Sequence, residues 1–103
     1  MTFKVRIGAA AFDDVQRLFE HLVDRARMVE DLAMANRARD AILDSLQGLS
    51  ASPFIYRKSA SSPFLREMLI PFGRSGHVAL FEIDDANAVT VLAVRHQLED
   101  DYH

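Results

Sequence analysis

Apolar and polar residues alternate with two different periods along the chain, and the change of period divides it into elements. Every second side chain between residues 2 and 7 is apolar, which predicts a strand with one buried face. From about residue 10 the apolar positions recur every three or four residues, which predicts an amphipathic helix. A second helical stripe runs from Ala35 to Leu49, with a stop signal at Gln47-Gly48.

The two helical stripes are not separated by glycine or proline, so the local sequence would allow one helix from residue 10 to residue 48. Such a helix would be about 58 Å long at 1.5 Å per residue, about twice the width of a domain of this size. The chain must therefore fold back on itself, and Asp31 is a suitable cap for the second helix. We expect an αα-hairpin with its turn near residues 28–31.

The second half of the chain carries strand patterns separated by turn residues. Residues 50–63, punctuated by serine and proline, are predicted to form a long loop. Three strands are expected after it, at Phe64–Pro71, His77–Ile83 and Ala88–His96, with turns at 73–76 and 84–87. The last strand has apolar side chains on both faces, with Val91 on one and Val94 on the other, which is typical of a covered central strand.

Together these elements predict an α+β fold in the order β-α-α-β-β-β, an antiparallel β-meander packed against an N-terminal αα-hairpin. With 103 residues the chain is large enough for one core and too small for two, so we expect a single domain spanning residues 1–103. The predicted core includes Val5, Ile7, Leu18, Leu22, Ile42, Leu46, Leu80, Val91 and Val94.

Composition and charge exclude several classes of function. There is no cysteine, so disulfides, a thiol nucleophile and thiolate zinc sites are ruled out. The four histidines, at 21, 77, 96 and 103, form no close ligand pair in the sequence, and we expect neither a metal nor another cofactor. No apolar run is long enough to span a membrane and the N-terminus does not resemble a signal peptide, so we expect a cytoplasmic protein. The net charge of −3, with an acidic run at residues 99–101, argues against binding of nucleic acid by bulk electrostatics.

Two stretches in the second half of the chain carry recognisable motifs. The first runs from Phe64 to Phe81 and reads FLREMLIPFGRSGHVALF; the second runs from Val91 to Gln97 and reads VLAVRHQ. They resemble a Leu-Arg strand, a glycine turn into an aromatic-aliphatic strand, and a closing strand ending in Val-Arg-His. These are features of the RelE/ParE superfamily of toxins from bacterial type II toxin–antitoxin operons, and the ending is most similar to ParE-type members known as plasmid stabilisation proteins.

The resemblance implies a toxin that a cognate antitoxin covers with an amphipathic helix. RelE-like members cleave messenger RNA in the ribosome, whereas ParE-like members poison DNA gyrase without nuclease chemistry. A third class is a toxin-derived domain that has lost its toxicity and only binds an antitoxin or itself. The 50% hydrophobic content of so small a chain fits apolar surface that an antitoxin, or self-association as a homodimer, would cover.

Candidate residues for RNA cleavage lie mainly on the strands and at the C-terminus. Such a reaction needs a base for the 2′-hydroxyl, a cation for the phosphate and an acid for the leaving oxygen. The candidates are Arg66 and Arg95 as cations, Glu67 or His96 as base, and His96, Tyr102 or His103 as acid. Arg66 and Glu67 alternate along a strand, as do Arg95 and His96, so each pair points to opposite faces and the set does not converge.

We therefore expect a ParE-like toxin that acts by binding, with no catalytic residues, and keep a ribosome-dependent mRNA endonuclease as the alternative. The predicted target-binding residues are Arg57, Lys58, Arg66, Arg95 and His96. Structural roles are the competing interpretation. Arg66 would then pair with Glu82 or another acid across the sheet, and Arg57 and Lys58 would belong to a solvated loop.

Overall fold

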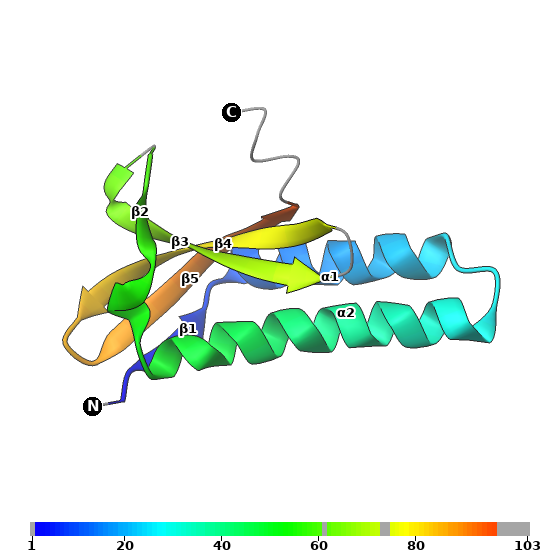
Figure 1. Ribbon diagram of the computed structural model, residues 1–103, viewed down its shortest axis with the longest axis horizontal. Helices are drawn as coiled ribbons and strands as arrows, with labels where there is room; N and C mark the ends of the chain where they lie inside the picture. The colour runs from blue at the N-terminus through cyan, green and yellow to red at the C-terminus, as the bar shows by residue number, and fades with distance from the viewer. Residues whose placement is uncertain (1, 61, 73–74, 97–103) are drawn as a thin grey trace.

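The computed structural model describes residues 2–60, 62–72 and 75–96. Within these residues lie the helices α1 (Ala9–Asp24) and α2 (Val29–Gln47), the short 3₁₀-helices η1 (Gly48–Ser50) and η2 (Pro53–Ile55), and the strands β1 (Lys4–Ile7), β2 (Arg57–Ser59), β3 (Ser62–Phe72), β4 (Ser75–Asp85) and β5 (Ala88–His96). Both long helices lie against one face of the sheet, and their hairpin projects beyond it (Figure 1). The predicted α+β class is confirmed.

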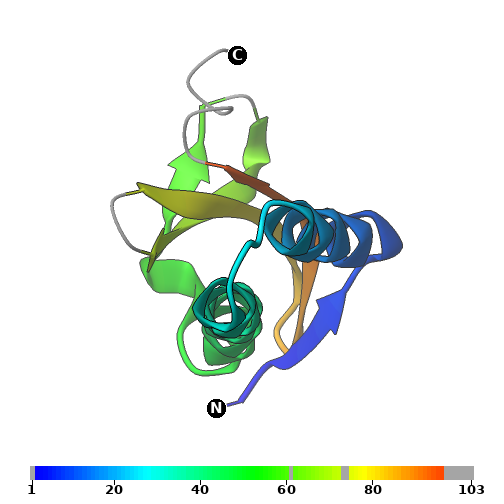
Figure 2. The same cartoon turned by 90° about the vertical axis from the view of Figure 1, so that its right-hand side faces the viewer.

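The strands form one mixed sheet in the order β1-β5-β4-β3-β2. Strands β2 to β5 make the antiparallel meander, and β1 joins its other side by pairing in parallel with β5. The sheet curves around α2 when viewed along the long axis of the molecule (Figure 2). Because β5 lies between β1 and β4, its prediction as an interior strand is confirmed.

The junction between β1 and α1 depends on a glycine. The Gly8 N–H donates to the Val91 carbonyl oxygen at 2.9 Å, which extends the β1–β5 pairing by one residue before the helix begins. A Cβ atom at position 8 would lie 3.0 Å from that same oxygen, closer than side chains normally approach backbone. Glycine therefore lets the chain turn from strand into helix directly against β5.

The αα-hairpin turns at residues 25–28, slightly before the predicted position. Asp31 is the third residue of α2 rather than its cap, and its Oδ2 accepts hydrogen bonds from the backbone N–H groups of Arg27 (3.0 Å) and Met28 (3.2 Å). The prediction that Asp31 precedes the helix is therefore wrong. The carboxylate instead reaches back from the first turn to satisfy donors of the connecting segment.

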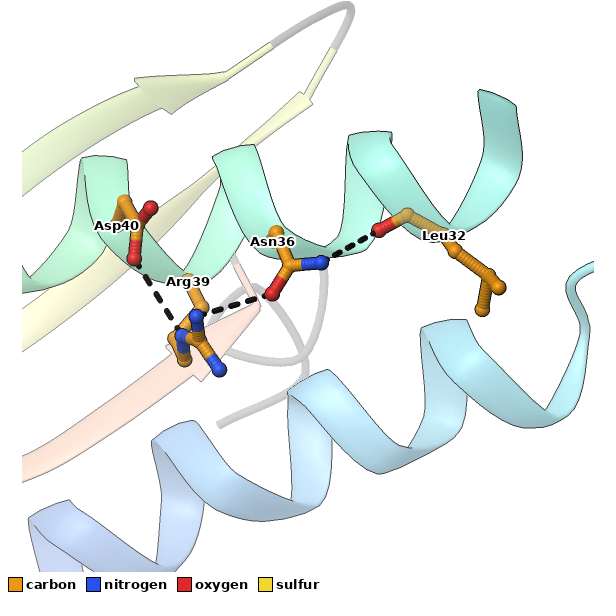
Figure 3. A network of polar contacts seen from close by, with 4 residues as sticks. All are labelled: Leu32, Asn36, Arg39 and Asp40. Carbon is orange, nitrogen blue, oxygen red and sulfur yellow. Dashed lines mark hydrogen bonds and ion pairs between the residues drawn. The ribbon is translucent and has the colours of Figure 1, made fainter. Parts of the chain in front are cut away.

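Polar contacts connect Leu32, Asn36, Arg39 and Asp40 along α2 (Figure 3). The Asn36 amide donates to the Leu32 carbonyl oxygen at 3.1 Å and accepts from Arg39 Nη2 at 2.9 Å. Arg39 also pairs with Asp40 and places its guanidinium carbon 4.6 Å from the ring centre of Phe19 on α1. Arg39 therefore connects this row of contacts on α2 with Phe19 of α1.

The core lies between the helices and the sheet. Its buried members include Phe3, Ala11, Val15, Ile42, Leu46, Leu49, Met68, Ile70, Ala79, Phe81, Val89, Val91 and Val94. Four of the predicted core residues belong to it, and Val5, Ile7 and Leu18 are partly buried against it. Leu22 and Leu80 are half-buried and lie outside this cluster, so their prediction as core residues is wrong.

A β-bulge explains why simple alternation fails in β5. Phe81 pairs with Val91 and Leu80 pairs with Ala93, so Leu92 is an extra residue on the β5 side. The bulge reverses the alternation, and Val91 and Val94 both join the core on the helix side. The prediction that they occupy opposite faces is therefore wrong.

The segment predicted as a loop at residues 50–63 contains regular structure. It holds η2 and β2, and β3 already begins at Ser62. Strand β2 was not predicted because a strand of three residues, Arg-Lys-Ser, has no apolar alternation to reveal it. The segment folds against β3, with Arg57 opposite Glu67 and Lys58 opposite Arg66.

Candidate target-binding surface

Cross-strand pairing divides the side chains of the sheet between two faces. The helix face carries Arg66, Met68, Ile70, His77, Ala79, Phe81, Val94 and His96. The opposite face, here called the open face, carries Arg57, Glu67, Leu69, Val78, Leu80, Ala93 and Arg95, and no helix of the described residues covers it. The five predicted target-binding residues are thus split between the two faces of the sheet.

Arg57 lies on the open face at the outermost strand. Its Nη2 atom is 3.6 Å from Oε2 of Glu67, whose side chain is almost buried while that of Arg57 is 64% exposed. A carboxylate held away from water needs a positive partner, and Arg57 provides it. Lys58, the next residue, is exposed at the same edge.

Arg66 has a structural role that the sequence did not reveal. Its Nη1 atom donates to the carbonyl oxygens of Tyr56 (2.7 Å) and Phe54 (3.4 Å), and its guanidinium carbon lies 5.4 Å from the ring centre of Phe54. The residue opposite it on β4 is Phe81, whereas Glu82 is opposite Leu65. The suggested Arg66–Glu82 pair does not form. The hydrogen bonds of Arg66 instead hold η2 and the residue after it, Tyr56, against β3.

Arg95 and His96 lie at the end of β5 on opposite faces of the sheet. Arg95 is exposed on the open face, in a row with Val78 and Leu69. Three strand spacings and one two-residue step separate it from Arg57, which corresponds to about 16 Å between Cα atoms. Half-exposed Leu69 lies in the space between these two arginines. The open face therefore presents the two guanidinium groups with half-exposed Leu69 between them, whereas Val78 in the same row is buried.

The candidate nuclease residues do not form one site within the described residues. Arg66 and His96 are on the helix face, whereas Glu67 and Arg95 are on the open face. Tyr102, His103 and the acidic run at 99–101 lie outside the described residues. The pairing thus does not bring Arg66, Glu67, Arg95 and His96 together around one phosphate.

A cavity of about 590 Å³ lies between α1 and the ends of β4 and β5, and we call it the histidine cavity. Its lining includes Asp14, Arg17, Leu18, His21, His77, Val94 and His96. The rings of His77 and His96, which are cross-strand partners, pack edge to face with their centres 5.5 Å apart. Three of the four histidines thus meet at one place, although sequence spacing gave no indication of it.

Asp14 fixes the position of α1 over this cavity. Its Oδ2 atom accepts the backbone N–H of Val94 at 2.9 Å, and its other oxygen pairs with Arg17. Strand β1 ends at Ile7, opposite Val91, so β5 continues past it without a strand neighbour on that side. The carboxylate therefore takes the place of the missing strand at the edge of β5.

Among the described residues, no three histidine, aspartate or glutamate side chains are arranged to hold a metal ion. None of the helices in the described part of the chain has the length and apolar character needed to cross a membrane.

The fold and the sequence were compared with known proteins. A solved structure titled "Chromosomal ParDE TA system from P. aeruginosa" has the same fold, with a TM-score of 0.71 over 92% of this chain and 96% of that chain, at 14% sequence identity. Residues 5–101 match the model of the family described as ParE toxin of type II toxin–antitoxin system, parDE. The chain belongs to this ParE toxin family. No curated protein matches its sequence closely enough to be a relative.

Proposed function

We propose that this chain is a toxin that acts by binding a protein target such as DNA gyrase and that a cognate antitoxin neutralises it. Membership of the ParE toxin family supports the toxin, and the ParDE system with the same fold supports an antitoxin partner. The single observation that carries the binding mechanism is the division of the candidate residues between the two faces of the sheet. This division favours recognition over catalysis of phosphoryl transfer.

The open face is the proposed target-binding surface. Arg57 and Arg95 flank the exposed apolar side chain of Leu69, and arginine beside apolar side chains is a common composition for the energetic centre of a protein interface. Arg66 is not part of this surface because it lies on the helix face and its guanidinium binds the carbonyl groups of Phe54 and Tyr56. Its replacement is expected to reduce stability rather than to abolish recognition.

The test replaces Arg95 by Ala and compares it with Arg37→Ala, which removes the same charge from an exposed position on α2. Each variant is induced in cells without antitoxin, and growth, the DNA damage response and messenger RNA ends on ribosomes are measured. Arg95→Ala should reduce toxicity at least tenfold, which corresponds to about 1.4 kcal/mol of binding free energy, whereas Arg37→Ala should leave it unchanged. The wild-type chain should induce the DNA damage response and leave messenger RNA intact.

New messenger RNA ends that appear with the wild-type chain and disappear with His96→Ala would overturn the binding mechanism in favour of an mRNA endonuclease. Absence of any toxicity, with intact binding of the antitoxin, would assign the chain to the toxin-derived domains that are no longer toxic. Antitoxin binding is measured separately by co-purification, so the two parts of the proposal are tested independently.

A further inference from the structure

The histidine cavity is separate from the open face, and its chemistry has no place in the proposed toxin mechanism. From the residues that line it, we propose that this cavity binds a phosphate group or an equivalent oxyanion. The lining combines a guanidinium group with three imidazoles, drawn from α1, β4 and β5. The proposal is independent of whether the chain poisons a target.

Most of the polar side chains that line the cavity can donate hydrogen bonds to an anion. The one carboxylate among its described lining residues, Asp14, already accepts the Val94 N–H and pairs with Arg17. The other ionisable groups of that lining are His21, His77 and His96, which are either neutral or positive. These imidazoles and the Arg17 guanidinium can therefore supply N–H donors to an anion.

The arrangement of the donors favours a tetrahedral oxyanion over a carboxylate. His77 is 6% exposed and forms the inner wall with His96, its cross-strand neighbour. Arg17 and His21 lie one turn apart on α1, and both are exposed, so they can bend toward a ligand from the other side. Phosphate has oxygens in several directions for N–H donors on three elements, whereas a carboxylate has two oxygens in one plane.

The size of the cavity also fits a small ligand, since a volume of about 590 Å³ lies within the range of about 300–1,000 Å³ common for such sites. A metal ion is the other ligand that histidines suggest. The described residues contain no group of three side chains arranged for metal binding, and Arg17 would repel a cation. The occupant we infer is therefore an oxyanion of the size of phosphate, either free or as part of a mononucleotide.

The experiment is an NMR titration of the histidine side chains in the full chain. Sulfate is the first probe, because it is a tetrahedral oxyanion of the size of phosphate. The resonances of His21, His77 and His96 should shift together and saturate.

Variants locate the site and provide the control. Arg17→Gln removes a charge that lines the cavity, from a side chain that is 73% exposed, and Arg37→Gln removes the same charge from α2. Arg17→Gln should weaken sulfate binding at least fivefold, whereas Arg37→Gln should change it less than twofold. Thermal unfolding of each variant verifies that it is folded.

Inorganic phosphate and adenosine 5′-monophosphate then distinguish the two sources of the phosphate group. Equal affinity for both would assign the site to the free ion, and at least tenfold tighter binding of the mononucleotide would assign it to a nucleotide. The proposal is overturned if the histidine resonances do not saturate with any of the three anions. It is also overturned if both arginine variants weaken binding equally, or if only Zn²⁺ produces saturable shifts.

Discussion

At the scale of single residues, Asp14 connects two elements that are distant in the sequence. Its carboxylate accepts the N–H of Val94, eighty residues away, and also pairs with Arg17 of its own helix. The sequence indicated only that Asp14 lies on the polar side of an amphipathic helix. The hydrogen bond could not be predicted from it, because the bond depends on where β1 stops along β5.

Replacement of Asp14 by Ala should therefore lower the free energy of unfolding by about 1–3 kcal/mol, because it leaves a partly buried N–H without its acceptor. Asp14→Asn should cost less, since an amide oxygen can still accept from Val94. The measurement is the midpoint of urea unfolding at pH 7. Asp13→Ala, at the exposed neighbouring position, is the control, and an equal effect in both variants would contradict the role given to Asp14.

Glu82 provides a prediction about pH. Burial raises the pKa of this carboxyl group above its ordinary value of 4.5, and a hydrogen bond with Asp84 and repulsion by the Asp84 charge raise it further. The folded state therefore binds this proton more tightly than the unfolded state, so the stabilisation is present at low pH and is lost as the pH rises above 4.5.

At pH 7, Glu82→Gln should unfold at a temperature about 2–4 °C higher than the wild type, as expected for relief of a screened like-charge contact worth about 0.5 kcal/mol. At pH 4 the two proteins should unfold at nearly the same temperature, since Glu82 is then largely protonated. Calorimetry at both pH values measures the difference. Glu20→Gln, with the same charge change on α1, should show no such pH dependence, and a shift of equal size there would refute the assignment to Glu82.

At the scale of elements, periodicity predicted the first strand, the two helices and the last three strands, whereas strand β2 and the bulge in β5 are determined by strand pairing. The apolar stripes of α1 and α2 face the sheet because an amphipathic helix must bury one side, and this information is local. Strand β2 and the bulge at Leu92 depend on partners in other strands, Glu67 and Arg66 for the first and Leu80 and Phe81 for the second. Strand pairing places the candidate residues on two faces of the sheet. Local alternation already predicted opposite faces for Arg66 and Glu67, and for Arg95 and His96.

The start of α2 is a test of capping at this scale. Asp31 accepts the N–H groups of both Arg27 and Met28 and lies near the positive end of the helix dipole. Asp31→Ala should lower the free energy of unfolding by about 1 kcal/mol, the usual cost of losing such a contact. Glu30→Ala, in the same first turn, is the matched control. Urea unfolding followed by circular dichroism should show a larger loss of unfolding free energy for Asp31→Ala than for Glu30→Ala. Equal losses would mean that the helix dipole alone, and not the hydrogen bonds, stabilises this end of α2.

At the scale of the whole molecule, exposed apolar side chains gather at both ends of the fold. Met28, Val29 and Leu32 surround the tip of the αα-hairpin, with Val29 79% exposed. Phe54, Ile55 and Phe64 lie at η2 and the start of β3, with Phe64 82% exposed. Such surface is unfavourable in water, and a partner that covers it would stabilise the folded chain. The sequence indicated excess apolar content, but only the fold shows where it remains uncovered.

The partner prediction follows from this surface and from the proposed antitoxin. A partner that binds only the folded chain, present at 100 times its dissociation constant, adds about 2.7 kcal/mol to the free energy of unfolding. For a chain of this size, that should raise the unfolding temperature by about 10–20 °C. The measurement is thermal unfolding of the purified chain with and without the protein encoded by the neighbouring gene. Light scattering determines whether the chain associates with itself. The prediction fails if the isolated chain stays monomeric and soluble at high concentration and its unfolding temperature does not change with that neighbour. This result would show that the exposed apolar surface needs no partner. It would also show that the neighbour is not the antitoxin.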